Sequence, residues 1–228
     1  MINRPNSEQS SRLALLGAAT IYEAQGQFGS IDAAVAAVDP SMRLVGPALT
    51  VDCGPSDNLM LHAVLEHAQP GDVIVADARG YLGAGAWGDV LTVAAQKMGV
   101  AGLILDGAIR DATDIIALGF PVFARGLSIR GTTKTYRGTI GEPVQIGGVR
   151  VHTGDIVVGD RDGLVVIPAE QLSRSLELAE ARAVKEEQFR QAIAAGATTV
   201  ELLGLRSIVD ELRPAPAVSA SAHSQIAR

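Results

Sequence analysis

A series of strand, helix, strand, helix and strand between residues 73 and 123 constrains the fold of this chain more than any other feature. Residues 73–77 (VIVAD) and 102–106 (GLILD) have the apolar, β-branched composition of buried strands, and residues 120–123 resume the pattern. Between the first two strands, apolar residues recur at helical spacing, with Asp89 as the predicted N-cap and Gly99 as the left-handed stop. Because crossovers of this kind join parallel strands, the sequence predicts an α/β fold with a parallel core.

The segments that follow the first two strands are predicted to meet. We expect a glycine-rich turn over 80–88 before Asp89, and a tight turn over 107–110 before Asp111 opens a short helix. The carboxyl ends of parallel strands lie at one edge of a sheet, so Asp89 and the pair Arg110-Asp111 should converge there. Each turn also leads into a helix N-terminus, whose free N–H groups suit a carboxylate ligand.

Two aspartates beside such an anion site call for a cation between them. Hard oxygen ligands favour Mg²⁺ or Mn²⁺ over zinc, which usually takes His or Cys. Aspartates at helix N-termini are also ordinary caps, and an Arg-Asp pair is often a surface ion pair. Spacing alone therefore leaves a metal site and a purely structural role open.

The same residues resemble the signature of a known family. Residues 85–89 (GAWGD) and 106–111 (DGAIRD) are similar to those of class II pyruvate aldolases, which cleave 4-hydroxy-4-methyl-2-oxoglutarate and 4-carboxy-4-hydroxy-2-oxoadipate. That family is related to the regulators of ribonuclease E activity, and the similarity runs from about residue 30 to residue 205. The aldolase branch has an Asp, twenty residues and then Arg-Asp, as Asp89 and Arg110-Asp111 do here. The regulator branch typically lacks the first aspartate.

The resemblance implies a role for each residue of this motif. Asp111 would be the direct protein ligand of Mg²⁺ or Mn²⁺, and Asp89 would hold the ion through a water molecule. Arg110 would bind the 2-oxo oxygen of the substrate and stabilise the enolate.

Other residues have roles implied by the same resemblance. At the start of the first helix, Gly88 and the backbone amides of Val90 and Leu91 would receive the C1 carboxylate. The C-terminal helix would reach the site of a neighbouring subunit and contribute a carboxylate through water. Alignment puts that carboxylate at Glu186, with Glu187 as the competing choice.

For the fold and assembly, the resemblance implies a layered β/β/α swivelling domain of the phosphohistidine-like type with a C-terminal helix, in a homotrimer or homohexamer. We expect one domain over residues 1–212. Residues 213–228 are small, polar and interrupted by proline, so we expect a disordered tail.

The implied activity is a divalent-metal-dependent lyase reaction in the catabolism of aromatic compounds. A 4-hydroxy-2-oxo acid would undergo retro-aldol cleavage to pyruvate through an enolate, with oxaloacetate decarboxylation as a side activity. The alternative is a non-catalytic regulator of the ribonuclease E type, which binds a protein partner. A methyltransferase is the weakest hypothesis, because no convincing adenosylmethionine loop follows the first parallel strand.

Two other kinds of catalytic site are disfavoured. Residues 83–88 (GAGAWG) match the dinucleotide-binding pattern, but Trp87 is bulky where the backbone must approach closely, and Asp89 is negative where a pyrophosphate would lie. A Schiff-base mechanism needs a desolvated lysine. None of the three lysines has an apolar sequence context that would bury it: Lys97, Lys134 and Lys185.

The roles of several residues stay open. His62, on a helix predicted over 58–67, could face the pocket together with Asn58 or be structural. A basic stretch could meet the distal carboxylate of a dicarboxylic substrate or form a solvated loop: Arg125, Arg130, Lys134 and Arg137. Cys53 is the only cysteine, which excludes a disulfide within the chain.

The composition limits the binding partners and the cellular location that we expect. A net charge of −6 and a pI near 5.2 argue against a general nucleic-acid surface. No apolar run reaches about eighteen residues, the length of a membrane span, and the polar N-terminus lacks a signal-peptide core. We therefore expect a cytoplasmic protein that binds neither membrane nor nucleic acid.

Overall fold

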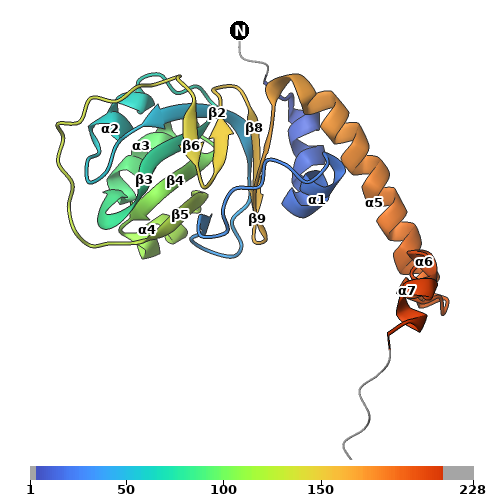
Figure 1. Cartoon of the computed structure of the whole chain (residues 1–228). Coiled ribbons are helices and arrows are strands. Elements are labelled where there is room, and N and C mark those ends of the chain that lie inside the picture. The colour runs from blue at the N-terminus through green and yellow to red at the C-terminus, as the bar shows by residue number, and fades with distance from the viewer. Residues whose placement is uncertain (1–3, 213–228) are drawn as a thin grey trace, which may run out of the picture. The chain divides into compact units, whose positions relative to one another are not determined.

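The structure is a computed structural model that describes residues 4–212, and most of its strands form one seven-stranded sheet (Figure 1). Strands β2 to β5 pair in parallel, whereas β1, β8 and β9 pair antiparallel with their neighbours. The prediction of an α/β fold with a parallel core is confirmed. In spatial order the strands are β1 (Ala36–Ala37), β5 (Val122–Leu127), β4 (Gly102–Ile109), β3 (Val73–Trp87), β2 (Leu44–Asp52), β8 (Ile156–Asp160) and β9 (Gly163–Ile167).

Both faces of the parallel core are covered, which explains why every residue of β4 is buried. One face packs against three helices through residues such as Leu61, Leu91 and Ile115. The other packs against a two-stranded hairpin through Val144 and Ile146. Hairpin, sheet and helices make the predicted β/β/α layers: the hairpin is β6 (Val144–Ile146) with β7 (Val149–Val151), and the helices are α2 (Leu59–Leu65), α3 (Asp89–Lys97) and α4 (Ala112–Ala117).

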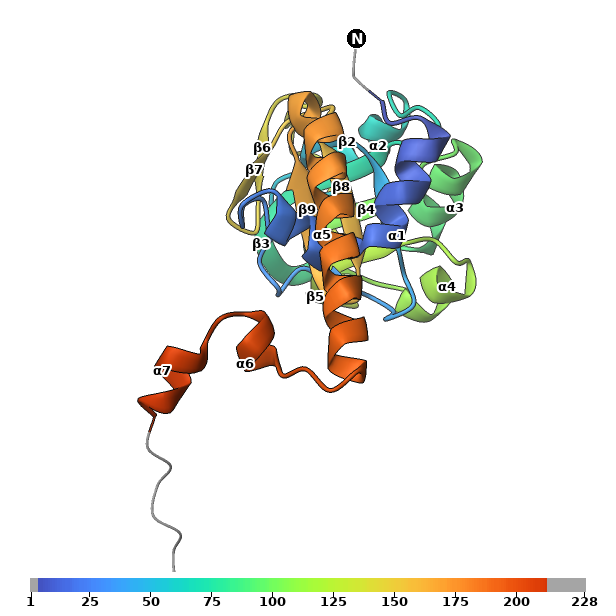
Figure 2. The ribbon, with the colours of Figure 1, turned by 90° about the vertical axis from the view of Figure 1, so that its right-hand side faces the viewer.

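A further helical layer packs on β8 and β9. Helix α1 (Ser7–Ala24) and the first part of α5 (Leu172–Ala194) lie beside these strands (Figure 2). They bury Leu13, Ile21 and Leu176 against them. Arg12 of α1 donates two hydrogen bonds to the Glu180 carboxylate, at 2.6 and 2.7 Å. The short 3-10 helix η1 (Ala169–Gln171) leads from β9 into α5.

The described chain divides into two compact units within α5, after Ala183. The second unit holds the rest of α5 and the short helices α6 (Thr199–Leu202) and α7 (Arg206–Asp210). A capping box between Thr198 and Glu201 begins α6. A single domain over residues 1–212 stays a prediction, and the expected tail at 213–228 lies outside the described residues.

The two turns predicted before the site are wrong. Strand β3 continues through the glycine-rich segment to Trp87, and β4 continues to Ile109, which is its pairing partner. The register between them shifts three times after Asp77, as expected where bulges are inserted. Glycine is required for this path at Gly85, since an added Cβ would collide with the backbone oxygen of Ser128.

Among the described helices, none combines the length and apolarity needed to cross a bilayer.

Candidate active site

The ends of β3 and β4 and the start of α3 line one side of a pocket of about 270 Å³. The residues predicted for this edge that line it are Gly88, Asp89, Val90, Leu91 and Arg110. Helix α2 and the loop after β5 line the rest, through residues that include His62 and Lys134. The predicted convergence of the two motif segments is therefore present in the structure.

Asp111 adopts an unusual backbone conformation beside this pocket. Its φ of 56° and ψ of 37° lie in the left-handed region, which costs a residue with a Cβ about 1–2 kcal/mol. It is the N-cap of α4, yet its side chain makes no capping hydrogen bond. Instead, Oδ2 lies 3.3 Å from the Arg110 Nε and 3.4 Å from the Asp89 amide nitrogen. The strained backbone directs the carboxylate toward the start of α3.

Gly88 makes this approach possible. An added Cβ would lie well inside van der Waals contact of the Asp111 Oδ2, and 3.3 Å from the Arg110 Nε. The structure makes Gly88 the N-cap of α3 and Asp89 its first helical residue, which corrects the predicted N-cap by one position.

The two strand ends that carry the motif are joined firmly. The Arg110 amide donates to the Trp87 carbonyl at 2.8 Å, and the Trp87 indole donates to the Thr92 hydroxyl at 2.8 Å. Trp87 is fully buried and stacks on Phe120 at a centroid distance of 6.4 Å. The position of the Arg110-Asp111 backbone is thus fixed by the core beneath it.

The N-terminus of α3 is only partly available to a ligand. The Val90 amide donates to the Oδ1 of Asp89 at 2.8 Å, and the first bond within the helix region runs from the Thr92 amide to the Gly88 carbonyl. Within residues 4–212 the Leu91 amide has no hydrogen-bond acceptor. Of the two amides predicted to receive a carboxylate, one is thus free and the other is held by Asp89.

The donor set fits a hard divalent cation. Asp89 and Asp111 offer carboxylate oxygens, and proteins commonly hold Mg²⁺ with one or two carboxylates and several waters. The part of the chain that the structure describes contains no group of three or more His, Cys, Asp or Glu placed to hold a metal.

The two glutamates proposed for a neighbouring site lie on α5, in the second unit. Glu187 is engaged within its own helix, where it accepts from Arg190 at 2.9 Å and from Gln191 at 3.0 Å. The Arg190 guanidinium lowers the pKa of Glu187. Glu186 is half-buried, and its role stays a prediction.

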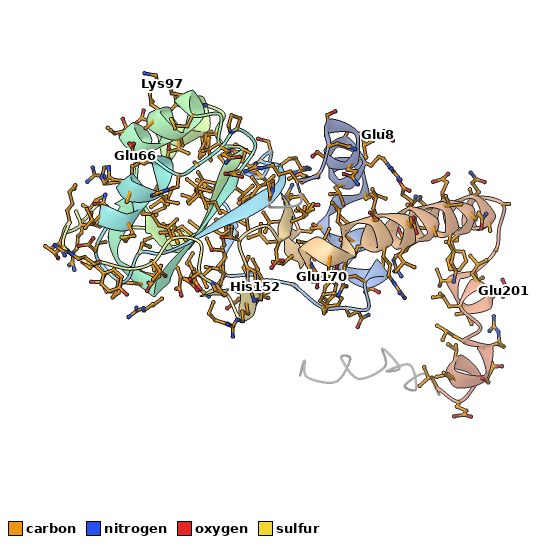
Figure 3. The ribbon with its side chains drawn as sticks, turned by 90° about the horizontal axis from the view of Figure 1, so that it is seen from above. Glu8, Glu66, Lys97, His152, Glu170 and Glu201 are labelled. Atoms are coloured by element: carbon orange, nitrogen blue, oxygen red, sulfur yellow. The ribbon has the colours of Figure 1, made fainter. Side chains whose placement is uncertain are left out.

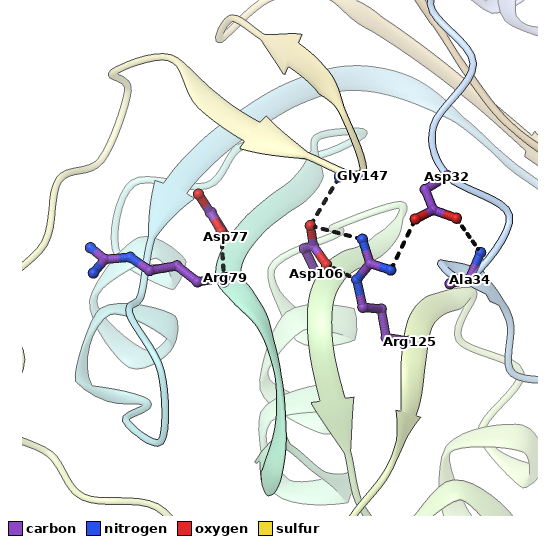
Figure 4. A network of polar contacts seen from close by, with 7 residues as sticks. All are labelled: Asp32, Ala34, Asp77, Arg79, Asp106, Arg125 and Gly147. Atoms are coloured by element: carbon purple, nitrogen blue, oxygen red, sulfur yellow. Dashed lines mark hydrogen bonds and ion pairs between the residues drawn. The ribbon is translucent and has the colours of Figure 1, made fainter.

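The predicted basic stretch divides in the structure. Lys134 lines the pocket, but Arg125 turns away to an ion-pair network with Asp106 and Asp32 (Figure 4). The hydrogen bond with Asp106 raises the pKa of Arg125, and the Gly147 amide of the hairpin turn donates to Asp106 at 2.9 Å. Arg125 therefore fastens the hairpin and the N-terminal segment to the sheet.

Two residues whose roles were left open also line the pocket. Asn58 and His62 face it from the start of α2. Burial lowers the pKa of His62, and the nearby Lys134 ammonium lowers it further. Lys97 is exposed at the end of α3 (Figure 3), which agrees with the expectation that it is no Schiff-base lysine.

Comparison with known proteins identifies the family. Residues 18–166 match the model of the RraA-like family, described as Aldolase/RraA, and the chain belongs to this family. A protein of Halalkalibacterium halodurans named "Putative 4-hydroxy-4-methyl-2-oxoglutarate aldolase" is 41% identical over 152 residues, which cover 67% of this chain and 72% of that protein. The family resemblance drawn from the motif is confirmed.

Solved structures share the fold. Streptomyces coelicolor RraAS2, described as an unusual member of the RNase ES inhibitor RraA protein family, has a TM-score of 0.73 and 32% identity, covering 82% of this chain and 99% of that one. An uncharacterised protein from Pseudomonas syringae has a TM-score of 0.76 and 27% identity, covering 86% and 96%. Relatives of this chain thus bear names of both an aldolase and a ribonuclease inhibitor.

Proposed function

We propose that the protein is a class II pyruvate aldolase that cleaves a 4-hydroxy-2-oxo acid with the help of Mg²⁺ or Mn²⁺. The observation that carries the proposal is the left-handed Asp111, whose carboxylate lies between the Arg110 guanidinium and the start of α3 beside the pocket. Strained residues cluster at functional sites. The strained conformation of Asp111 directs its carboxylate toward the start of α3 and forms no capping hydrogen bond with α4.

The N-terminus of α3 and Arg110 would bind the shared head of such substrates. The free Leu91 amide and the partial positive charge of the helix end suit the C1 carboxylate, which would compete with Asp89 for the Val90 amide. Arg110 keeps its terminal guanidinium nitrogens without a protein partner in residues 4–212. It can therefore hold the 2-oxo oxygen and stabilise the negative charge that develops there.

Asp89 and Asp111 would hold the cation, which when bound supplies a Lewis acid for the 2-oxo acid head. Cleavage breaks the C3–C4 bond of the substrate, leaves its electron pair in the enolate of pyruvate, and releases a carbonyl fragment. A base must take the C4 hydroxyl proton, and a water held by the Asp89 carboxylate is the candidate in this chain. Protonation of C3 then gives pyruvate. The same enolate would form on decarboxylation of oxaloacetate.

The proposal extends to the assembly. In a homotrimer or homohexamer, Glu186 of a neighbouring chain would add a third carboxylate to Asp89 and Asp111. Glu186 would thereby raise the number of carboxylates at the proposed metal site from two to three.

Pyruvate release coupled to lactate dehydrogenase tests the activity. We expect release from 4-carboxy-4-hydroxy-2-oxoadipate or 4-hydroxy-4-methyl-2-oxoglutarate with Mg²⁺ or Mn²⁺, and its loss with EDTA. Release from oxaloacetate alone would leave an enolate-forming site with another substrate. No release from any of them, with a complex formed on a ribonuclease E column, would favour the regulator.

A further inference from the structure

A second cavity, of about 550 Å³, shares no lining residue with the candidate active site. It is formed by the loop after α1, by β7 and the loop that follows it, and by the end of β9 with η1. His152 and Glu170, which Figure 3 labels, line it from different elements. Its volume falls within the range of about 300–1,000 Å³ that is usual for small-molecule sites. The apolar part of its wall consists of Phe28, Val149, Val166 and Pro168.

A strained turn presents Phe28 to this cavity. The residues on either side of it, Gln27 and Gly29, have left-handed φ angles of 63° and 81°, and at Gln27 this conformation is unfavourable because of the Cβ. Buried Gln25 holds the turn, since its Nε2 donates to the Phe28 carbonyl at 2.7 Å and to the Val166 carbonyl at 3.1 Å. The Phe28 ring nevertheless stays 40% exposed. The turn therefore holds an aromatic side chain at the cavity instead of burying it in the core.

Two unpaired charges of opposite sign line the same cavity. Arg150 comes from β7 and Glu170 from η1. Across residues 4–212, neither side chain forms an ion pair, with each other or with any other residue. A purely anionic ligand would meet the Glu170 carboxylate, and a purely cationic ligand would meet the Arg150 guanidinium. A ligand that carries both charges would satisfy both side chains.

Asp155 joins the two elements that carry these charges. Its buried carboxylate accepts from the His152 amide at 2.8 Å and from the Ala169 amide at 3.1 Å, which links the loop after β7 to the start of η1. The backbone positions of Arg150 and Glu170 are thus set by one anchor. The His152 Nδ1 lies 3.4 Å from the Asp155 Oδ2. The Nε2 of the same ring has no protein partner in the part of the chain that the structure describes, so it can form a hydrogen bond with a ligand.

We infer that this cavity is a binding site for a free α-amino acid with an apolar side chain. The ligand carboxylate pairs with Arg150, the ligand ammonium pairs with Glu170, and the apolar side chain packs on Phe28. Gln25 and Asp155 are positioning residues, because they hold the elements that carry these three side chains. The inference does not rest on the proposed function, since it uses none of the residues assigned to the aldolase site.

Calorimetric titration with three related ligands tests each charge of the ligand separately. L-Phenylalanine has both charges, 3-phenylpropanoate lacks the ammonium, and 2-phenylethylamine lacks the carboxylate. Each is titrated into the full-length wild type and into Arg150→Met, Arg150→Lys and Glu170→Gln. Arg161→Met is the matched control, because Arg161 is exposed, forms no ion pair within residues 4–212 and does not line the cavity.

We expect L-phenylalanine to bind the wild type and Arg161→Met with a Kd below about 1 mM. The two analogues should bind the wild type at least about tenfold more weakly, because each lacks one charge-assisted contact. Arg150→Met and Glu170→Gln should weaken binding of L-phenylalanine by a similar factor, and Arg150→Lys should retain most of it. All four variants should keep the thermal unfolding midpoint of the wild type, because the substituted side chains are exposed.

Three results would overturn the inference. The first is no saturable binding of L-phenylalanine or L-leucine to the wild type at about 10 mM ligand. The second is equally tight binding of 3-phenylpropanoate and L-phenylalanine, which would show that the site does not recognise the ammonium. The third is unchanged affinity in Arg150→Met, which would place the ligand elsewhere on the molecule. None of these results would affect the proposed aldolase activity, which pyruvate release tests independently.

Discussion

Among single residues, Asp111 combines a left-handed backbone conformation with a proposed role as metal ligand. Glycine adopts φ of 56° without the Cβ penalty, so Asp111→Gly should be more stable than Asp111→Ala by about 1 kcal/mol. Both variants should lose at least a hundredfold in pyruvate release. Urea unfolding beside the coupled assay checks this, and equal stability of the two variants would show that the left-handed backbone stores no strain.

The contribution of Asp57 to the stability of the fold should depend on pH. Burial alone would raise the pKa of this carboxyl, but hydrogen bonds from Thr133, Thr135 and Leu59 lower it well below the usual range. A lowered pKa means that the folded state holds the carboxylate more strongly than the unfolded state does. The resulting stability is present above the ordinary pKa of 3.8 and is lost as the pH falls below it.

Asp57→Asn should therefore lower the free energy of unfolding by about 2 kcal/mol at pH 7, as expected for bonds to a charged group. The difference from the wild type should shrink below pH 4. Denaturant titrations at pH 7 and pH 3.5 measure this difference in the free energy of unfolding. A difference that does not change with pH would show that the hydrogen bonds to Asp57 do not depend on its charge.

At the scale of elements, the approach of β3 to Asp111 depends on Gly88. Gly88→Ala should cut activity at least tenfold, because the new Cβ must displace the Asp111 carboxylate. Gly131 is the matched control, since it lines the same pocket and an added Cβ meets no atom within 4 Å. Comparable losses in both variants would contradict the steric argument.

Some of the helices and strands could be predicted from the sequence, and others could not. Periodicity located α3 and the buried parts of β3 to β5, and parallel connectivity correctly brought Asp89 to Arg110-Asp111. The bulged extension of β3 escaped prediction, because a glycine-rich run resembles a turn until its pairing with β4 is known. The position of Lys134 at the pocket could not be predicted either. Its loop has no periodic sequence pattern, and it is held by a hydrogen bond between Thr133 and Asp57, which are 76 residues apart in the chain.

For the whole molecule, the proposed role of Glu186 requires active sites that are shared between chains. Asp111→Asn and Glu186→Gln should each be inactive as pure proteins. After co-expression, activity should return to at most about one quarter of the wild-type rate, since an intact site draws its two residues from two subunits. No recovery in mixed oligomers would place both residues of a site in one chain and contradict the shared arrangement.

The proposed reaction depends on the formation of a pyruvate enolate in this pocket. Exchange of the pyruvate methyl protons with deuterated solvent, followed by proton NMR, tests that step without knowledge of the natural substrate. We expect rapid exchange with Mg²⁺ or Mn²⁺, loss of exchange with EDTA, and a decrease of at least a hundredfold in Asp111→Asn and Arg110→Met. Wild-type protein that keeps its fold but shows no metal-dependent exchange would contradict the enzymatic account.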